Sequence, residues 1–333
     1  MNDFRVESTR GELVESVFRV SLVVVDEGGR TVAHAGDPSL TTFWRSAAKP
    51  FQAMPLVADG AADRFGLGPE ELALACASHS SEPAHLDIVR RFLAKVGCVE
   101  SDLACGPHVP LGAAVASEVA RQGTTLTPVW SNCSGKHAGM LGVARHHGWP
   151  VAGYEQAGHP VQERIVDEVA RWAGLAHDRI GIGVDGCTTV CFALPLSAMA
   201  LAYARFGVAD EPAARRLRSA MQGHPLLIAG TGRLCTEIME AAPAGIIAKI
   251  GAEGVYSAAL PALGLGLALK VESGEMRAAS AALVGAVRQL LERFAPASLD
   301  ALGPAVRFDP APIRNTRDEV TGVLKSAGSL RFR

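Results

Sequence analysis

The start of the chain carries a strand pattern that constrains the fold more than any other segment. Residues 12–25 begin with near alternation of apolar and polar side chains and end in the run Leu22-Val23-Val24-Val25. This pattern is typical of a strand that enters a core. The pair Gly28-Gly29 then predicts a turn into a second strand around Thr31–His34. Because an isolated hairpin is only marginally stable, the chain must bury it against further elements.

The pattern after this hairpin changes from strand to helix and back again. Apolar side chains recur with a period near 3.6 over much of residues 60–175, which predicts helices there. The predicted helices are Ala84–Val96, Gly112–Arg121, Ala138–His147, Val161–Ala173, Leu196–Tyr203, Glu211–Met221, Arg233–Ala241 and Arg277–Phe294. The predicted later strands are Arg179–Val184, Gly245–Ile250 and Gly266–Val271.

This order predicts an α/β fold of the α+β type, with a mixed, largely antiparallel sheet flanked by helices and a separate helical lobe. We predict one catalytic unit over residues 1–325. Its sheet-containing layer takes residues 1–60 and 178–325, and its helical lobe takes residues 61–177. Residues 326–333 are predicted to form a tail, with a frayed end at residues 331–333.

Composition and charge exclude several classes of protein. A hydrophobic content of 48% with 20% charged residues is typical of a globular chain rather than a disordered one. The net charge of −2 gives no electrostatic reason to expect nucleic acid or an anionic membrane as a partner. The first residues lack the apolar core of a signal peptide, and the longest apolar runs are too short to span a bilayer. We therefore expect a cytoplasmic protein that binds neither nucleic acid nor a membrane.

The segment Phe43–Gln52 places a serine hydroxyl and a lysine ammonium three residues apart, at Ser46 and Lys49, in a chain with only six lysines. An apolar run follows, so Ser46 is expected at a helix start. Residues at i and i+3 share a helix face with about 5–6 Å between their Cβ atoms. Lys49 is then within reach of the Ser46 proton, which a lysine can take only when it is neutral. A surface helix with an ordinary lysine is the competing interpretation.

Two segments place reactive polar side chains where packing alone would not require them. Ser78 and His79 come directly after an apolar run, where the hydroxyl could contact substrate or the segment could be an ordinary capping loop. Residues 132–137, Asn-Cys-Ser-Gly-Lys-His, look like a P-loop only superficially. The first glycine is absent and His137 stands where Ser or Thr belongs, so nucleotide binding is rejected. A helix start with these polar side chains suits an anion or a polar substrate group.

Two further segments place reactive side chains at strand ends. Asp185 and Cys187 follow a predicted strand, either in an ordinary turn or in an active site. Cys133 and Cys187 could share a zinc ion, although their spacing fits no standard zinc motif. Lys249 ends a predicted strand before x-Gly, which resembles the K-T-G element of serine β-lactamases except that Ile250 replaces the hydroxyl residue.

Together these segments resemble the L-asparaginase II family, the zinc-containing type first met in rhizobia. The resemblance covers nearly the whole chain, with long blocks in the family's order. The blocks are Val14–Ser16, Arg45–Gln52, Ser78–Ser80, Asn132–His137, Val184–Cys187, Lys249–Tyr256 and Ile313–Asn315.

The resemblance implies a fold similar to that of serine β-lactamases and glutaminases, and two Ser–Lys pairs. Ser46 with Lys49 matches one pair, and Ser78 with Lys249 matches the other. The expected reaction is hydrolysis of the side-chain amide of L-asparagine to L-aspartate and ammonia through an acyl-enzyme. Ser46 is favoured as the nucleophile because its helix-start geometry is self-contained, with Lys49 as the base, but the sequence leaves the choice between the two serines open.

The resemblance also implies a zinc site on Cys133, Lys136 and Cys187, and a homodimer. Such a zinc ion would position substrate rather than generate hydroxide, because a serine nucleophile makes metal-bound water redundant.

Four residues are predicted to contact the substrate. Asp185 is the candidate for its α-amine, and Arg45 or the zinc ion for its α-carboxylate. His79 and Asn132 are the other predicted contacts. Selectivity for asparagine over glutamine depends on one methylene, and the sequence does not display the pocket that would decide it.

The chain departs from the family's pattern at a few positions. The family usually has His and Gly near Phe18 and Val20, Asp-Gly near Ser273-Gly274, and Gly near Asp318. Two other functions stay open: a penicillin-recognising serine hydrolase or esterase, and a non-catalytic protein that binds zinc or an amino acid.

Overall fold

The computed structural model describes residues 4–241 and 245–333, and it divides the chain into two compact units. Unit 1 contains the residues up to Ala47, Leu194–Val208 and the residues from Glu237 onward. Unit 2 contains Ala48–Ala193 and Ala209–Thr236. The prediction of a single catalytic unit over residues 1–325 stays a prediction.

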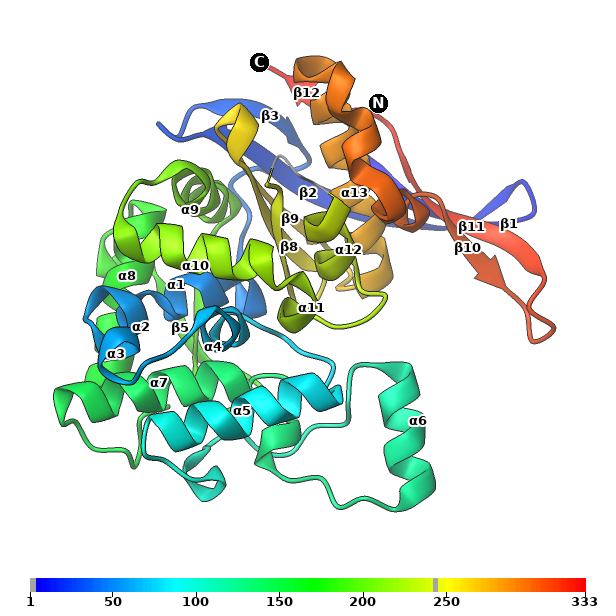
Figure 1. The fold of residues 1–333 in the computed structure, drawn as a ribbon. Coiled ribbons are helices and arrows are strands. Elements are labelled where there is room, and N and C mark those ends of the chain that lie inside the picture. Colours follow the sequence, from blue (N-terminus) through cyan, green and yellow to red (C-terminus); the bar gives the residue numbers. More distant parts are fainter. Residues whose placement is uncertain (1–3, 242–244) are drawn as a thin grey trace. The chain divides into compact units, whose positions relative to one another are not determined.

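Unit 1 is built on an antiparallel sheet (Figure 1). Its strands follow the order β10-β11-β1-β2-β9-β8-β7, and β3 pairs with both β2 and β12. The strands are β1 (Arg5–Arg10), β2 (Leu13–Asp26), β3 (Thr31–Ala35), β7 (Ile247–Gly251), β8 (Val255–Leu260), β9 (Leu265–Val271), β10 (Ala311–Arg314), β11 (Val320–Ala327) and β12 (Arg331–Phe332). A short strand, β4 (Thr41–Phe43), also belongs to this unit.

The long strand β2 shows how burial follows pairing. Its second half, Val20–Asp26, pairs with β9, and Leu22–Val25 also pairs with β3. The side chains from Val20 to Val25 are buried, whereas those from Leu13 to Val17 are exposed. The predicted hairpin of β2 and β3 is therefore confirmed, and its β-branched end forms the core of the sheet.

Two helices pack against the sheet, and glycines set how closely they approach. The helices of unit 1 are α9 (Leu196–Val208) and α13 (Met276–Phe294), with 3-10 turns at Pro261–Leu263 and Pro296–Phe308. A Cβ atom on Gly266 of β9 would lie 2.0 Å from the carbonyl oxygen of Ala200 in α9. A Cβ atom on Gly285 of α13 would lie 2.2 Å from Ser326 Oγ in β11. Only glycine allows these contacts between helix and strand.

The last residues of the chain include a short strand, and the tail at residues 326–333 stays a prediction as a domain boundary. β12 pairs with β3 through Arg331 opposite His34, so the prediction of a frayed end at residues 331–333 was wrong. The edge of β3 offers unpaired backbone groups, and a short polar strand can satisfy them without an apolar pattern. Asp318, in the turn between β10 and β11, has a φ of +65°. This left-handed conformation suits the glycine that the resemblance leads one to expect there.

Unit 2 is mainly helical. Its helices are α1 (Lys49–Gln52), α2 (Met54–Ala58), α3 (Ala61–Arg64), α4 (Pro69–Ala75), α5 (Pro83–Lys95), α6 (Ala113–Gln122), α7 (Ser134–His147), α8 (Pro160–Ala173), α10 (Pro212–Gly223) and α11 (Pro225–Ile228). Helix α12 (Leu234–Ala241), strand β6 (Val190–Pro195) and the 3-10 turn Arg45–Ala48 cross the boundaries between the units. Strand β5 (Gly181–Val184) pairs with β6.

Within unit 2, the start of α7 packs tightly on the end of α4. A Cβ atom on Gly135 would lie 2.4 Å from the carbonyl oxygen of Leu74, so only glycine fits there. This approach brings residues 132–136 beside residues 76–79, two segments that the sequence marked independently. By contrast, α6 has no buried side chain and is connected by long loops (Figure 1).

The predicted fold class is confirmed: an antiparallel sheet flanked by helices, and a helical lobe. The predicted helices are present as α5, α6, α7, α8, α9, α10, α12 and α13. The strands that the sequence did not predict lack a clear alternation of apolar and polar side chains: β1, β4, β6, β8, β10, β11 and β12. Among the helices in the described part of the chain, none has the length and apolar character that a membrane crossing needs.

Candidate active site

Lys49 is a buried lysine at the first position of α1, with 1% of its surface exposed. Its Nζ donates to Ser78 Oγ at 2.9 Å, to the carbonyl oxygen of Ala77 and, at 3.5 Å, to that of Asn132. All three partners lie in unit 2. The structure thus places Lys49 with Ser78, whereas the sequence predicted Ser46 as its partner. The Ser46–Lys49 pair stays a prediction.

The three partners of Lys49 differ in what they can do with a proton. The carbonyl oxygens of Ala77 and Asn132 can only accept hydrogen bonds, whereas the Ser78 hydroxyl can accept or donate. An ammonium has three N–H donors and an amine has two. If two N–H groups of Lys49 donate to the two carbonyl oxygens, the third N–H of the ammonium form donates to Ser78 Oγ. The arrangement is therefore suited to pass a proton between Lys49 and Ser78.

The backbone of Ser78 is fixed on both sides by the segment 225–233. Its N–H donates to the carbonyl oxygen of Ile228 at 2.9 Å, and its own carbonyl accepts from Arg233 Nη1 at 2.5 Å. Nearby, Ser80 Oγ donates to the carbonyl oxygen of Ala229 at 2.8 Å. These bonds orient the Ser78 side chain toward Lys49.

His79 is a fully buried, neutral histidine with a defined tautomer. Its Nδ1 accepts from the Ser81 N–H at 3.2 Å, so its Nε2 carries the proton and donates to Ser134 Oγ at 2.9 Å. Burial is the largest effect that holds the pKa of His79 well below its usual value. The positive charges of Lys49 and Arg233 lower that pKa further. His79 therefore links the Ser78 segment to the start of α7 as a structural donor.

The start of α7 and the turn after β5 bring two thiols and an amine together. Lys136 Nζ donates to Cys187 Sγ at 3.1 Å, and Cys133 Sγ donates to Asn132 Oδ1 at 2.9 Å. A hydrogen bond from Cys187 lowers the pKa of the Cys133 thiol well below its usual value, against the effect of burial. The same hydrogen bond, together with burial, raises the pKa of Cys187.

Lys136 has acidic surroundings. Burial alone lowers its pKa, but the charges of Cys187 and Cys133 together raise that pKa above its usual value. Asp185 adds to this effect. Asp185 is half-buried and its Oδ1 accepts from the Gly186 N–H at 2.7 Å, which holds the carboxylate in the turn.

The predicted residues Arg45, Ser46 and Lys249 lie in unit 1. Ser46 is half-buried in the 3-10 turn, and Lys249 is fully buried in β7 with Nζ donating to the carbonyl oxygen of Ile250 at 3.0 Å. Trp44 Nε1 donates to Ser257 Oγ at 3.0 Å, and Ser257 pairs with Lys249 across the sheet. The segment that carries Ser46 is therefore anchored beside the strand that carries Lys249.

Phe18 lies on β2 opposite Val6 and is half-buried. The residue therefore occupies a strand face of unit 1.

Sequence reasoning missed Arg233 and Ser134, although both contact predicted site residues. Arg233 follows the apolar run Leu226–Ala229 in the short polar stretch Thr231-Gly232-Arg233, which was the available signal. Ser134 was visible in the motif, but its contact with His79 depends on how α7 packs.

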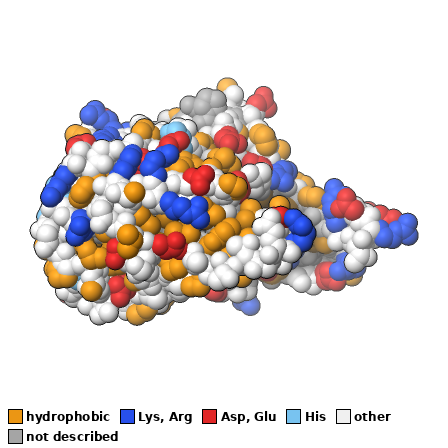
Figure 2. Space-filling view, turned by 60° about the horizontal axis from the view of Figure 1, so that its bottom comes forward, with side chains coloured by type: hydrophobic (Ala, Val, Ile, Leu, Met, Phe, Trp, Pro, Cys, Tyr) orange, Lys and Arg blue, Asp and Glu red, His pale blue; other side chains and the backbone are white. Residues whose placement is uncertain are grey.

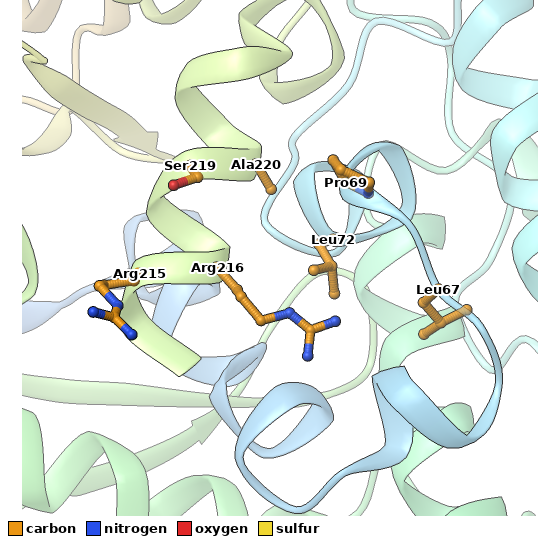
Figure 3. A pocket seen from close by; sticks show the side chains of 7 residues that line it. All are labelled: Leu67, Pro69, Leu72, Arg215, Arg216, Ser219 and Ala220. Carbon is orange, nitrogen blue, oxygen red and sulfur yellow. The ribbon is translucent and has the colours of Figure 1, made fainter. Parts of the chain in front are cut away.

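Two cavities on the surface of unit 2 are lined by residues other than the predicted site residues. A cavity of about 380 Å³ lies between α10 and the start of α4, with Leu67, Leu72 and Arg216 on its wall (Figure 3). Another, of about 440 Å³, lies between α5 and α6. Over the face shown in Figure 2, acidic and basic side chains are interspersed with apolar ones, consistent with the small net charge.

Comparisons with known proteins give one extended match. The model of the L-asparaginase II family matches residues 6–326. No curated protein matches the chain significantly.

Solved structures match weakly. Mglu in its native form in 4.3 M NaCl is 18% identical with a TM-score of 0.43, covering 83% of this chain and 61% of that one. A second native Mglu structure is 17% identical with a TM-score of 0.44, covering 83% and 64%. Simvastatin synthase (LovD) from Aspergillus terreus is 12% identical with a TM-score of 0.35, covering 76% and 86%. The chain spans less than two thirds of the length of the Mglu structures, and these likenesses do not establish a shared function.

Proposed function

Because the chain belongs to the L-asparaginase II family, we propose that this amide hydrolase acts on L-asparagine, releasing L-aspartate and ammonia through a serine acyl-enzyme. The observation that carries the proposal is the buried hydrogen bond from Lys49 Nζ to Ser78 Oγ, at 2.9 Å. A buried lysine that donates to two carbonyls and a hydroxyl is suited to proton transfer rather than to an ion pair.

In the proposed reaction, Ser46 attacks the side-chain amide carbon and neutral Lys49 takes its proton. The chain itself supports this pair, because Ser46 precedes Lys49 by three residues. Lys49 then passes the proton to Ser78, whose hydroxyl gives its own proton to the departing ammonia. General acid–base help of this kind typically contributes about 10²–10⁴-fold in rate.

Lys249 is proposed to support this transfer by its positive charge, and backbone N–H groups, including that of Ser46, to stabilise the oxyanion. Each such donor is worth around 3 kcal/mol in mutational tests. Water then attacks the acyl-enzyme with Lys49 again as the base, which releases aspartate and restores the serine.

Substrate binding is proposed to use charged groups for the amino-acid end. Asp185 supplies a carboxylate for the α-amine, and Arg45 is the cation that the sequence suggested for the α-carboxylate. The other two predicted contacts make hydrogen bonds within the protein that limit their freedom: the His79 ring donates to Ser134, and Asn132 Oδ1 accepts from Cys133.

The residues proposed to hold zinc are Cys133, Lys136 and Cys187, and their chemistry fits the metal. Two sulfurs and an amine are soft and borderline donors of the kind zinc prefers. Among His, Cys, Asp and Glu, the described part of the chain gathers no set of three for a metal, and the proposed set includes Lys136. Binding would displace the Lys136 proton. Once bound, the ion would supply a positive charge that orients substrate.

The test is ammonia release by the purified chain from L-asparagine, L-glutamine and no substrate, with Ser46→Ala and Ser78→Ala in parallel. We expect release from asparagine, a loss of about 10³-fold or more in Ser46→Ala, and a smaller loss in Ser78→Ala. No release from either amide would rule out the function. A Ser46→Ala variant that keeps most activity while chelation abolishes it would rule out the serine mechanism. The homodimer and the cytoplasmic location stay predictions.

A further inference from the structure

Arg233 is a half-buried arginine whose guanidinium is only partly used. It directly precedes α12, and its Nη1 donates to the carbonyl oxygens of Ser78, at 2.5 Å, and Ala229, at 3.2 Å. A guanidinium has five N–H donors in a planar fork. Within residues 4–241 and 245–333, its Nε and its Nη2 donate no hydrogen bond to the protein.

No carboxylate pairs with Arg233 in the described part of the chain, although one lies on the facing segment. Glu82 instead accepts from the backbone N–H of Thr231 at 2.7 Å and from Thr231 Oγ1 at 3.1 Å. The turn that makes this possible depends on Gly230, which has a φ of +123°. A Cβ atom there would lie 2.6 Å from Ser80 Oγ and 2.7 Å from Glu82 Oε1. Among the described residues, Glu82 thus accepts hydrogen bonds from Thr231, and no carboxylate pairs with Arg233.

Arg233 is connected through Ser78 to a second cation, the buried Lys49. Ser78 links Arg233 and Lys49, since its carbonyl accepts from one and its hydroxyl from the other. The two nearby histidines, His79 and His85, are buried and stacked at 5.2 Å between ring centroids. A partly desolvated cation of this kind is a favourable place for a ligand carboxylate, which a guanidinium can bind through two parallel hydrogen bonds.

We propose that Arg233 binds the α-carboxylate of the amino-acid substrate. This assignment rests on the proposed function and replaces Arg45 as the cation for that group. The hydrogen bond to the Ser78 carbonyl fixes Nη1, which leaves the other N–H donors of the guanidinium to pair with the carboxylate. Binding then orients the amino acid relative to the Ser78 hydroxyl, because one residue contacts both Arg233 and Lys49.

The test compares two amides that differ only in the α-carboxylate: L-asparagine and 3-aminopropanamide. The variants are Arg233→Gln and Arg233→Lys, with Arg45→Gln as the rival and Arg90→Gln, on the exposed face of α5, as the matched surface control. We expect Arg233→Gln to lower kcat/KM for asparagine by about 10–100-fold, the range for a lost hydrogen bond to a charged group. Its activity on 3-aminopropanamide stays within about twofold of the wild type.

Calorimetric titration with L-aspartate and with 3-aminopropanoate, which lacks the α-carboxylate, measures the same discrimination without turnover. We expect Arg233→Gln to weaken aspartate binding alone, and Arg233→Lys to restore part of it because it keeps the charge. Arg90→Gln leaves both ligands unchanged.

Equal losses on both amides and both acids in Arg233→Gln would assign the residue a purely structural role and overturn the inference. Selective loss in Arg45→Gln, with Arg233→Gln unchanged, would overturn it in favour of Arg45. A wild-type chain that releases no ammonia from asparagine would instead overturn the proposed function. In that case the aspartate titration still decides whether Arg233 binds the carboxylate.

Discussion

Two buried lysines of unit 2 have opposite surroundings. Lys49, at the start of α1, donates to a hydroxyl and two carbonyls. Lys136, in the first turn of α7, donates to Cys187 and lies within the field of Cys133 and Asp185. Both side chains are at most 3% exposed, so burial does not separate them. The neighbours therefore decide what each lysine can do, because neutral oxygen acceptors suit proton transfer whereas sulfur and carboxylate neighbours suit an ammonium or a metal.

The most direct test of this contrast is to remove each amine while keeping the side-chain volume. Lys49→Met should lower kcat by about 10²–10⁴-fold, because it removes the base from the transition state. Lys136→Met should lower the zinc content of the purified chain and raise KM, with a smaller change in kcat. Steady-state kinetics and atomic absorption distinguish the two results. If both variants lost kcat equally and kept their zinc, the proposed division of roles would be wrong.

Two glycines of α7 test whether the packing of α7 on α4 holds the surroundings of Lys49 and Lys136 side by side. Gly135→Ala would place a Cβ atom 2.4 Å from the Leu74 carbonyl, so we expect a loss of about 2 kcal/mol or more in the free energy of unfolding. Gly139→Ala is the matched control, since its Cβ would lie 3.5 Å from Ala75 Cβ, an ordinary contact. It should gain up to about 1 kcal/mol from helix propensity. Urea unfolding measures both variants, and similar values for the two would contradict the close approach.

His79 connects the Ser78 segment to the start of α7, and its protonation makes the free energy of unfolding depend on pH. Burial holds its pKa well below the usual value, so the folded chain keeps it neutral while the unfolded chain protonates it below about pH 6.5. The unfolded state then binds more protons, and stability falls as the pH falls below that value, by at most about 1.4 kcal/mol per pH unit.

The variant His79→Gln keeps an N–H donor for Ser134 but cannot titrate. We expect its unfolding free energy to fall less than that of the wild type between about pH 6.5 and 5.5. Urea unfolding at the two pH values checks this, and equal slopes would show that His79 is not the group responsible.

Much of the candidate site could be recognised from residue types and local spacing. The chain alone identified Ser46, Lys49, Ser78 and the Asn132–His137 segment as chemically unusual, because reactive side chains there interrupt apolar patterns. It also located the helices, since a period of 3.6 reports which face of a helix is buried. The hairpin at the start followed from its β-branched run and its two glycines.

Only the tertiary structure decided which of these groups meet. Lys49 reaches Ser78 and the carbonyl of Asn132 across long stretches of chain, and no spacing rule encodes that pairing. Arg233 donates to the Ser78 carbonyl because the segment after α11 packs beside Ser78. Glu82 accepts its hydrogen bonds from Thr231 rather than from Arg233. The physical reason is that the periodicity of apolar residues is a local property of the sequence. The partner of a buried polar group depends instead on how distant elements pack, and on which of them leaves a hydrogen-bond donor unused.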